Sequence, residues 1–216
     1  MEAFLKMKKY EGREMVNRSR FIEYVKKMPE DEKQELYERV DELIYQNREF
    51  CDKRNHQHLC NIFTSIALYK FLQKKGFSEE EAYDTTAETM YAYMRTRKEK
   101  FEKMAGYPIF WRLIRWIVPV GFKYGSGAGW RYTWHKDEDE NVLRFECNEC
   151  IYQKIFRKHN FVKLGPMFCK NDVIVYGELP GIDFQITGTL CQGHDRCDFC
   201  FIRHPAGEAF TRSKSR

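Results

Sequence analysis

Most of the side chains that could do chemistry gather in roughly a quarter of the chain, between Phe145 and Arg203. This cysteine-rich segment holds six of the eight cysteines and two of the six histidines. Thiols concentrated in this way are typical of metal ligation or of thiolate chemistry. The side chains concerned are Cys147, Cys150, Cys169, Cys191, Cys197, Cys200, His159, His194, Asp172, Asp183 and Asp195.

Two Cys-x-x-Cys pairs, at 147–150 and 197–200, suggest a four-cysteine structural zinc site by their number. Zinc-binding pairs of this kind need a tight turn that lets both thiolates converge on the ion. The second pair instead lies in a segment with the pattern of a strand, where residues three apart point to opposite faces. We therefore expect Cys197 to share a face with Phe199, and Cys200 to point the other way.

A different grouping places thiols at the edges of a sheet, where a thiolate or a thiolate-bound metal can meet a substrate. Cys169 and Asp172 are expected just before a strand, and Cys150 is expected to open a helix. Cys191, His194 and Cys197 flank a turn that contains glycine.

Each of these side chains also has a purely structural interpretation. A lone cysteine is most often a small buried apolar residue, and Asp172 could equally be a turn residue. His56 and His58, at a helix start, are expected as capping or surface residues. The structural interpretation is adopted for Cys51, Cys60, Cys147 and Cys200.

The sequence resembles the L-2-amino-thiazoline-4-carboxylic acid hydrolase family at several places, which together cover most of residues 60–203. The closing Gly-x-x-x-Cys-x-Phe pattern from Gly193 is also similar to 4-vinyl reductase-type small-molecule-binding domains, which are α+β. The matching segments are GAGW (127–130), FECNECIYQKIF (145–156), FCKND (168–172), TGTLCQGHDRCDFCF (187–201) and the helix IALYKFLQKKGFSEEEA (66–82).

The resemblance implies hydrolysis of 2-aminothiazoline-4-carboxylate to N-carbamoyl-cysteine. This reaction needs a nucleophile at the amidine-like C2 carbon, a proton donor for the departing thiolate and a cation for the carboxylate. Cys169 is the expected nucleophile or metal ligand, and Asp172 the expected acid/base. The residues expected to complete the catalytic and substrate-binding pocket are Cys197, His194, Cys150, Arg131 and Trp130.

A metal version of this site uses Cys150, Cys169 and Cys197 to hold one zinc or iron ion that activates water. The additional thiols Cys147, Cys191 and Cys200 depart from the family's plain pattern and favour metal binding or redox sensitivity. The alternative function, from another class, is a non-catalytic small-molecule or metal-binding sensor of the vinyl-reductase type, for which we expect a mainly apolar cavity and an Asp172 turned to solvent.

Composition and charge indicate which kinds of binding partner the protein can have. The net charge of +5 is spread among mixed charges, which argues against nucleic acid. The resemblance implies a small-molecule substrate. The start of the chain has no signal-peptide pattern, so we expect a cytoplasmic protein with reduced thiols. The longest apolar stretch, Trp111 to Phe122, is too short and too broken for stable membrane insertion, but its aromatic residues could support a homodimer.

These residues must be positioned by helices and strands. The order of the helices and strands that the sequence predicts indicates an α+β fold, with an N-terminal helical layer packed on a C-terminal antiparallel β-sheet. We expect a single domain over 1–216. Its parts are a mainly helical half at 1–125, a segment at 107–129 that could act as a lid, a β-rich cysteine-containing half at 130–204 and a tail at 205–216.

Periodicity and caps predict the individual elements. Pro119 is expected to end a short helix near Trp111, and 125–129 is expected as a hinge or close-approach turn. Helices are expected near 30–50, 58–75, 78–104 and 150–159; strands at 130–134, 142–147, 172–178, 182–191 and 196–203; and a turn at 137–141.

Overall fold

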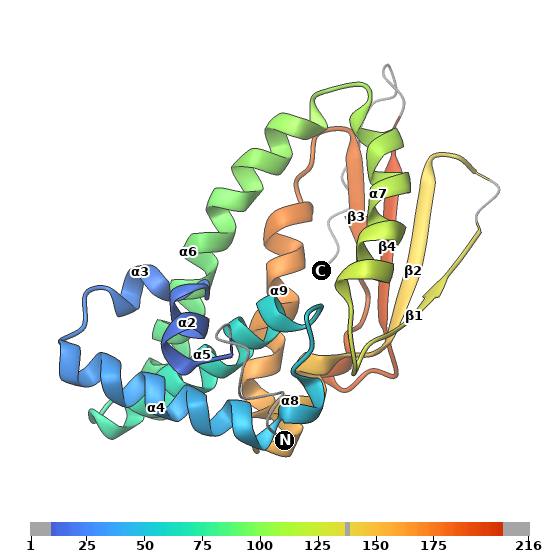
Figure 1. Ribbon diagram of the computed structural model, residues 1–216. Coiled ribbons are helices and arrows are strands. Elements are labelled where there is room, and N and C mark those ends of the chain that lie inside the picture. Colours follow the sequence, from blue (N-terminus) through green and yellow to red (C-terminus); the bar gives the residue numbers. More distant parts are fainter. Residues whose placement is uncertain (1–9, 137–138, 205–216) are drawn as a thin grey trace.

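The computed structural model describes residues 10–136 and 139–204 (Figure 1). Their architecture is α+β, as expected: a helical half is followed by a four-stranded antiparallel sheet with interleaved helices. The tail at 205–216 and part of the turn at 137–141 lie outside the described residues. The elements are α2 Gly12–Asn17, α3 Ile22–Val25, α4 Glu30–Gln46, η1 Arg48–Phe50, α5 His56–Lys74, α6 Glu79–Ala105, α7 Phe110–Gly125, β1 Arg131–Trp134, β2 Val142–Glu149, α8 Ile151–Lys158, η2 Val162–Leu164, α9 Gly165–Tyr176, β3 Ile182–Gln185, η3 Leu190–Gln192 and β4 Cys197–Arg203.

The centre of the helical half is α5, which is buried on all sides. Every residue from Leu59 to Tyr69 is buried, because α2, α4, α6 and α8 surround the helix. The predicted capping box starts α6: the Ser78 hydroxyl accepts from the Glu81 amide at 3.2 Å, and the Glu81 carboxylate accepts from the Ser78 amide at 2.8 Å. Among the described residues no helix is long and apolar enough to cross a bilayer.

The helix near Trp111 does not end at Pro119, which corrects the prediction: α7 continues through the proline to Gly125. A proline inside a helix removes one backbone hydrogen bond and crowds the preceding turn. Packing beyond the proline compensates here. Phe122 lies against the rings of Tyr132 and Phe145, with centroids 4.9 and 5.2 Å away, so the last turn is held against the sheet.

The sheet has the strand order β1-β2-β4-β3, and α7 crosses in front of it in Figure 1. Phe145 pairs with Phe199 and stacks on it at 4.8 Å, and Cys147 pairs with Cys197. This face is buried, so the predicted sharing of one face by Cys197 and Phe199 is confirmed. The strand predicted at 182–191 is shorter, because β3 ends at Gln185.

The strand predicted at 172–178 is wrong, because these residues belong largely to the helix α9. The run Val173-Ile174-Val175 has β-branched side chains and mimics a strand, but Pro166 at the first turn starts a helix. In Figure 1, α9 lies between α6 and the sheet and packs along α6. Cys169 and Asp172 therefore stand one turn apart on a helix, not at a strand edge.

Candidate functional site

The GAGW turn is held against the loop before α5. The amides of Gly127 and Ala128 donate to the side chains of Asn55 and Asp52, at 3.1 and 3.0 Å. A Cβ at Gly127 would lie 2.1 Å from the Asp52 carboxylate, so only glycine allows this approach. The turn is thus the expected close approach, and it fixes Trp130, whose indole N–H donates to Asn55 at 3.1 Å.

Trp130 helps to enclose His58, which faces the interior and not the surface. The two ring centroids are 4.9 Å apart, and Nδ1 of His58 lies 2.9 Å from the Tyr152 hydroxyl. Burial, followed by the nearby Arg20, lowers the pKa of His58 to about 4. The imidazole is therefore neutral at physiological pH, and its interaction with Tyr152 joins α5 to α8.

Five cysteines meet where the sheet joins α8 and α9, each thiol interacting with the next. We call them the thiol line. They come from β4, the end of β2, the residue that caps α8, η3 and α9, so the fold joins positions up to fifty residues apart in the sequence. In order, the thiol line is Cys197, Cys147, Cys150, Cys191 and Cys169.

The loop after β3 is built to place Cys191 in the thiol line. The Asp198 carboxylate accepts from the amides of Thr187 and Gly188, both at 2.9 Å, and so fixes the start of the loop. The Leu190 amide points at the Cys197 sulfur at 3.3 Å. On the other side, a Cβ at Gly165 would lie 2.9 Å from the Cys191 sulfur, so glycine at the start of α9 admits the thiol.

The thiols of the line differ sharply in acidity. The thiols of Cys147 and Cys191 lower the pKa of Cys150 well below its usual range, and the amides at the start of α8 add to this effect. The Cys191 thiol likewise lowers the pKa of Cys169. The pKa values of Cys147 and Cys191 rise, mainly because each interacts with two neighbouring thiols. These directions favour the thiolate form at Cys150 and Cys169 and the protonated form at Cys147 and Cys191.

Asp172 lies in the same interior region. Burial raises the pKa of its carboxyl to about 7, with a further contribution from Cys150. Arg20 opposes this rise, and it also lowers the pKa values of Tyr152 and Tyr176, so its guanidinium lies within electrostatic range of all three side chains.

Arg20 is a partly buried cation held by its backbone, whose amide donates to Asn61 of α5 at 2.9 Å. Within residues 10–136 and 139–204, no carboxylate forms an ion pair with its guanidinium. The charge therefore acts on the interior without being neutralised by an adjacent acid.

The structure brings together some of the sequence-predicted residues but not all. Cys150, Cys169 and Cys197 lie in the thiol line, with Asp172 and Trp130 nearby. His194 is exposed, and its ring packs over Gly188, where a Cβ would lie 2.6 Å from it. Arg131 is also exposed, and its Nε donates to Glu149 at 2.9 Å.

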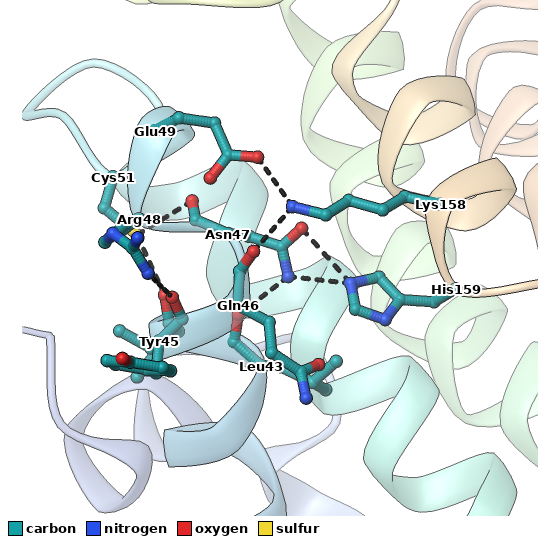
Figure 2. Close-up of polar contacts among 10 residues, drawn as sticks. Leu43, Tyr45, Gln46, Asn47, Arg48, Glu49, Cys51, Lys158 and His159 are labelled. Atoms are coloured by element: carbon teal, nitrogen blue, oxygen red, sulfur yellow. Dashed lines mark hydrogen bonds and ion pairs between the residues drawn. The ribbon is translucent and has the colours of Figure 1, made fainter.

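His159, the other histidine of the cysteine-rich segment, has a structural role. Its Nε2 lies 2.8 Å from the Asn47 amide nitrogen, and Lys158 beside it pairs with Glu49 at 2.6 Å, so the end of α8 is clamped to the end of α4 (Figure 2). Burial lowers the pKa of His159.

Sequence reasoning missed Arg20, His58 and Tyr152, because they come from separate elements and form no short-range motif. Tyr152 alone carried a signal, since it belongs to the family-like segment 145–156.

A metal site of the expected kind is not formed by the side chains as they stand. In the described part of the chain, no group of three or more His, Cys, Asp or Glu residues is arranged to hold an ion. The thiols interact in pairs along the thiol line, each with its neighbours. The zinc or iron ion therefore stays a prediction.

A hollow of about 260 Å³ reaches the thiol line at Cys191. Gly165 and Gly193 border it on either side of the thiol, and Gln153 donates to the Leu190 carbonyl at 2.6 Å and so supports its wall. This hollow gives a small molecule a route to Cys191, the residue between Cys150 and Cys169.

Comparison with known proteins agrees with the family-like segments. The family model of L-2-amino-thiazoline-4-carboxylic acid hydrolase matches residues 51–201, which include every residue of the thiol line but not Arg20. No curated protein and no solved structure matches the chain. The family's name implies a hydrolase with a small-molecule substrate. Because the match covers well over half of the sequence, the chain belongs to the L-2-amino-thiazoline-4-carboxylic acid hydrolase family.

Proposed function

We propose that the protein hydrolyses a small cyclic amidine of the 2-aminothiazoline-4-carboxylate type, with Cys169 as nucleophile and Asp172 as acid/base. One observation carries the proposal. Two titratable groups one turn apart on α9 have their pKa values moved in opposite directions, the thiol downward and the carboxyl upward to about 7. Such a pair supplies a thiolate and a protonated acid at the same pH.

In the first step the Cys169 thiolate attacks C2 of the ring. The bond from C2 to the ring sulfur breaks, and the departing thiolate takes the proton of the Asp172 carboxyl. The substrate is then held on the enzyme as an isothiourea through the Cys169 sulfur, and Asp172 is left as a carboxylate.

In the second step the Asp172 carboxylate takes a proton from water as the water oxygen attacks the same carbon. The bond to Cys169 breaks, the Cys169 thiolate is restored, and the product leaves as an N-carbamoyl-cysteine. Cys191 supports both steps, because its thiol stabilises the Cys169 thiolate whenever this is the free or leaving group.

Arg20 is the proposed partner of the substrate carboxylate. Its guanidinium acts on Asp172 and Tyr152 and has no ion-pair partner among the described residues, whereas Arg131 is already paired with Glu149 on the surface. A guanidinium in a partly buried site binds a carboxylate more strongly than an exposed one.

The interior position of Asp172 favours the hydrolase over the non-catalytic sensor, for which we expected an Asp172 that faces solvent. A metal version, with Cys150, Cys169 and Cys197 as ligands, uses the same side chains and is separated from the thiolate version by the experiment below.

The test is conversion of 2-aminothiazoline-4-carboxylate to N-carbamoyl-cysteine, followed by mass spectrometry, together with elemental analysis of protein purified without chelator. Cys169→Ala should lower kcat by about 10⁴-fold or more, as loss of a nucleophile does, while Cys60→Ala in α5 stays near wild type. Full activity of Cys169→Ala in folded protein would refute the assignment. One equivalent of zinc or iron that is lost in Cys169→Ala would replace the thiolate mechanism by the metal version.

A further inference from the structure

Helix α7 has two apolar faces, and only one of them is covered. Phe110, Trp111 and Ile114 are buried against the sheet. The other face carries a stripe of large apolar side chains at helical spacing, which we call the α7 stripe. Its members are Ile109, just before the helix, Leu113, Trp116, Ile117, Val120 and Tyr124.

The α7 stripe is strongly exposed. Trp116 is 70% exposed, Tyr124 64% and Ile109 58%, and Tyr107 and Met104 extend the apolar surface toward α6. Apolar side chains scattered singly over a surface are ordinary, but a contiguous patch of this length marks an interaction site. In Figure 1, α7 lies in front of the sheet. The exposed fractions of the stripe residues place them on the solvent side of the helix.

The charges around the stripe have one sign. α7 contains Arg112, Arg115 and Lys123 and no acidic residue. From the helical spacing, Arg112 and Lys123 border the stripe along one side. No described residue forms a hydrogen bond or ion pair with the Arg112 side chain.

A hollow of about 570 Å³ beside the stripe is also basic. Arg112, Arg115 and Arg203 line it, together with Trp111, Trp116 and Glu140. Glu140 is its only acid among the described residues, and this carboxylate lies 3.8 Å from Arg203, which offsets one of the three cations. The hollow therefore keeps a positive charge next to an exposed indole.

We propose that α7 lies on the surface of an anionic lipid bilayer, with the α7 stripe in the interface and the bordering cations on lipid phosphates. Aliphatic and aromatic side chains on one face with basic residues beside them are typical of interfacial helices, and Trp prefers the headgroup region. The association is peripheral, since no described helix can cross a bilayer.

Charge favours a lipid surface over a second copy of the chain. Two copies joined through this face would bring together two helices with three cations each and no acid, and like charges held close in an interface oppose association. An anionic bilayer supplies the missing negative charge.

The test is co-sedimentation of the full-length protein with vesicles of phosphatidylcholine alone and of phosphatidylcholine mixed with phosphatidylglycerol. We expect binding to the mixed vesicles that falls at high ionic strength. The double variant Trp116→Glu, Ile117→Glu should bind at least about tenfold more weakly, because it removes two apolar anchors and adds negative charge. Arg112→Gln should weaken binding about fivefold.

The matched control is Tyr45→Glu, because Tyr45 is 67% exposed but lies on α4. It should bind vesicles like wild type, and circular dichroism should show that all variants are folded. The proposal is overturned if the wild type binds neither vesicle, or if the double variant binds as well as wild type. It is also overturned if light scattering finds a wild-type dimer without vesicle binding that the double variant converts to a monomer.

Discussion

The cysteines of the helical half and those of the thiol line show that burial alone does not decide what a thiol can do. Burial raises the pKa of both Cys51 and Cys60 to about 12. The sulfur of Cys51 lies 3.6 Å from the Asn47 carbonyl, an acceptor that holds the proton on the thiol (Figure 2). These two cysteines are small packing residues, as expected from the sequence.

Cys169 is about as accessible as Cys51, yet its pKa moves the other way. The difference lies in the neighbours: the charges of Glu49 and Asp52 add to the effect of burial on Cys51, whereas Cys169 lies beside the Cys191 thiol, which lowers its pKa. Cys150 has a neighbouring thiol on each side, Cys147 and Cys191, and stands at the start of a helix. Neighbouring thiols thus lower the pKa of Cys150 and Cys169 because their hydrogen bonds to sulfur replace those that water would otherwise give.

Among the substitutions that test the comparison between the two groups of cysteines, Asp172→Asn is expected to have the largest effect on activity. The amide keeps the shape of the carboxyl but cannot exchange a proton with the leaving thiolate or with water. We expect kcat to fall by about 10²- to 10⁴-fold, while Asp84→Asn, on the exposed face of α6, leaves kcat unchanged. A pH–rate profile should lose the ionisation near 7. Wild-type activity in Asp172→Asn would mean that the acid/base lies elsewhere.

The same substitution should change how stability depends on pH. The folded-state pKa of Asp172 is raised from 3.8 to about 7, so its contribution to stability is complete below the unfolded-state pKa and is lost as the pH rises through 7. Asp172→Asn removes this loss of stability with rising pH, because the amide does not titrate. In urea unfolding, the variant should therefore gain stability relative to wild type between pH 5 and pH 8, by a few kcal/mol at most. An identical pH dependence in both proteins would place the carboxyl in solvent.

The next prediction concerns the rate of alkylation, which compares the reactivity of the two groups of thiols directly. A thiol with a pKa of about 12 is only about 10⁻⁵ ionised at pH 7. The thiolate of such a basic thiol is more nucleophilic, which offsets part of the loss in rate caused by this low ionised fraction. We expect iodoacetamide to modify Cys169 at least about tenfold faster than Cys51, as measured by peptide mass mapping at early times. The similar accessibility of the two residues makes Cys51 the internal control. Equal rates would show that the thiol line does not activate Cys169.

The two regions also differ in how well the sequence predicts them. The helical half can be predicted from short-range sequence signals. The capping box at Ser78 indicates where α6 begins, and the apolar spacing in α5 indicates a helix there. The thiol line depends on contacts between elements far apart in the chain. The β-branched run in α9 predicted a strand, but Pro166 starts a helix there and α9 packs along α6.

The candidate site shows the same limit. Cys150, Cys169, Cys197 and Asp172 could be named from their types and from the family-like segments. The role of Cys191 as the central donor and the inward direction of Arg20 could not, because both depend on where a loop closes. Two glycines were a usable sequence signal of close contacts. A Cβ at Gly127 would meet Asp52, and a Cβ at Gly165 would meet Cys191.

The smallest effect, and the most specific, is expected from Cys191→Ala. This change leaves Cys169 and Cys150 in place but removes the thiol that lowers the pKa of both. The pH midpoint of Cys169 alkylation should rise by about one unit, and its rate at pH 7 should fall by up to about tenfold. Cys51→Ala should shift neither, since Cys51 lies outside the thiol line. If Cys191→Ala leaves the midpoint where it is, the neighbouring thiol does not activate Cys169, and the contrast between the two groups of cysteines has a different cause.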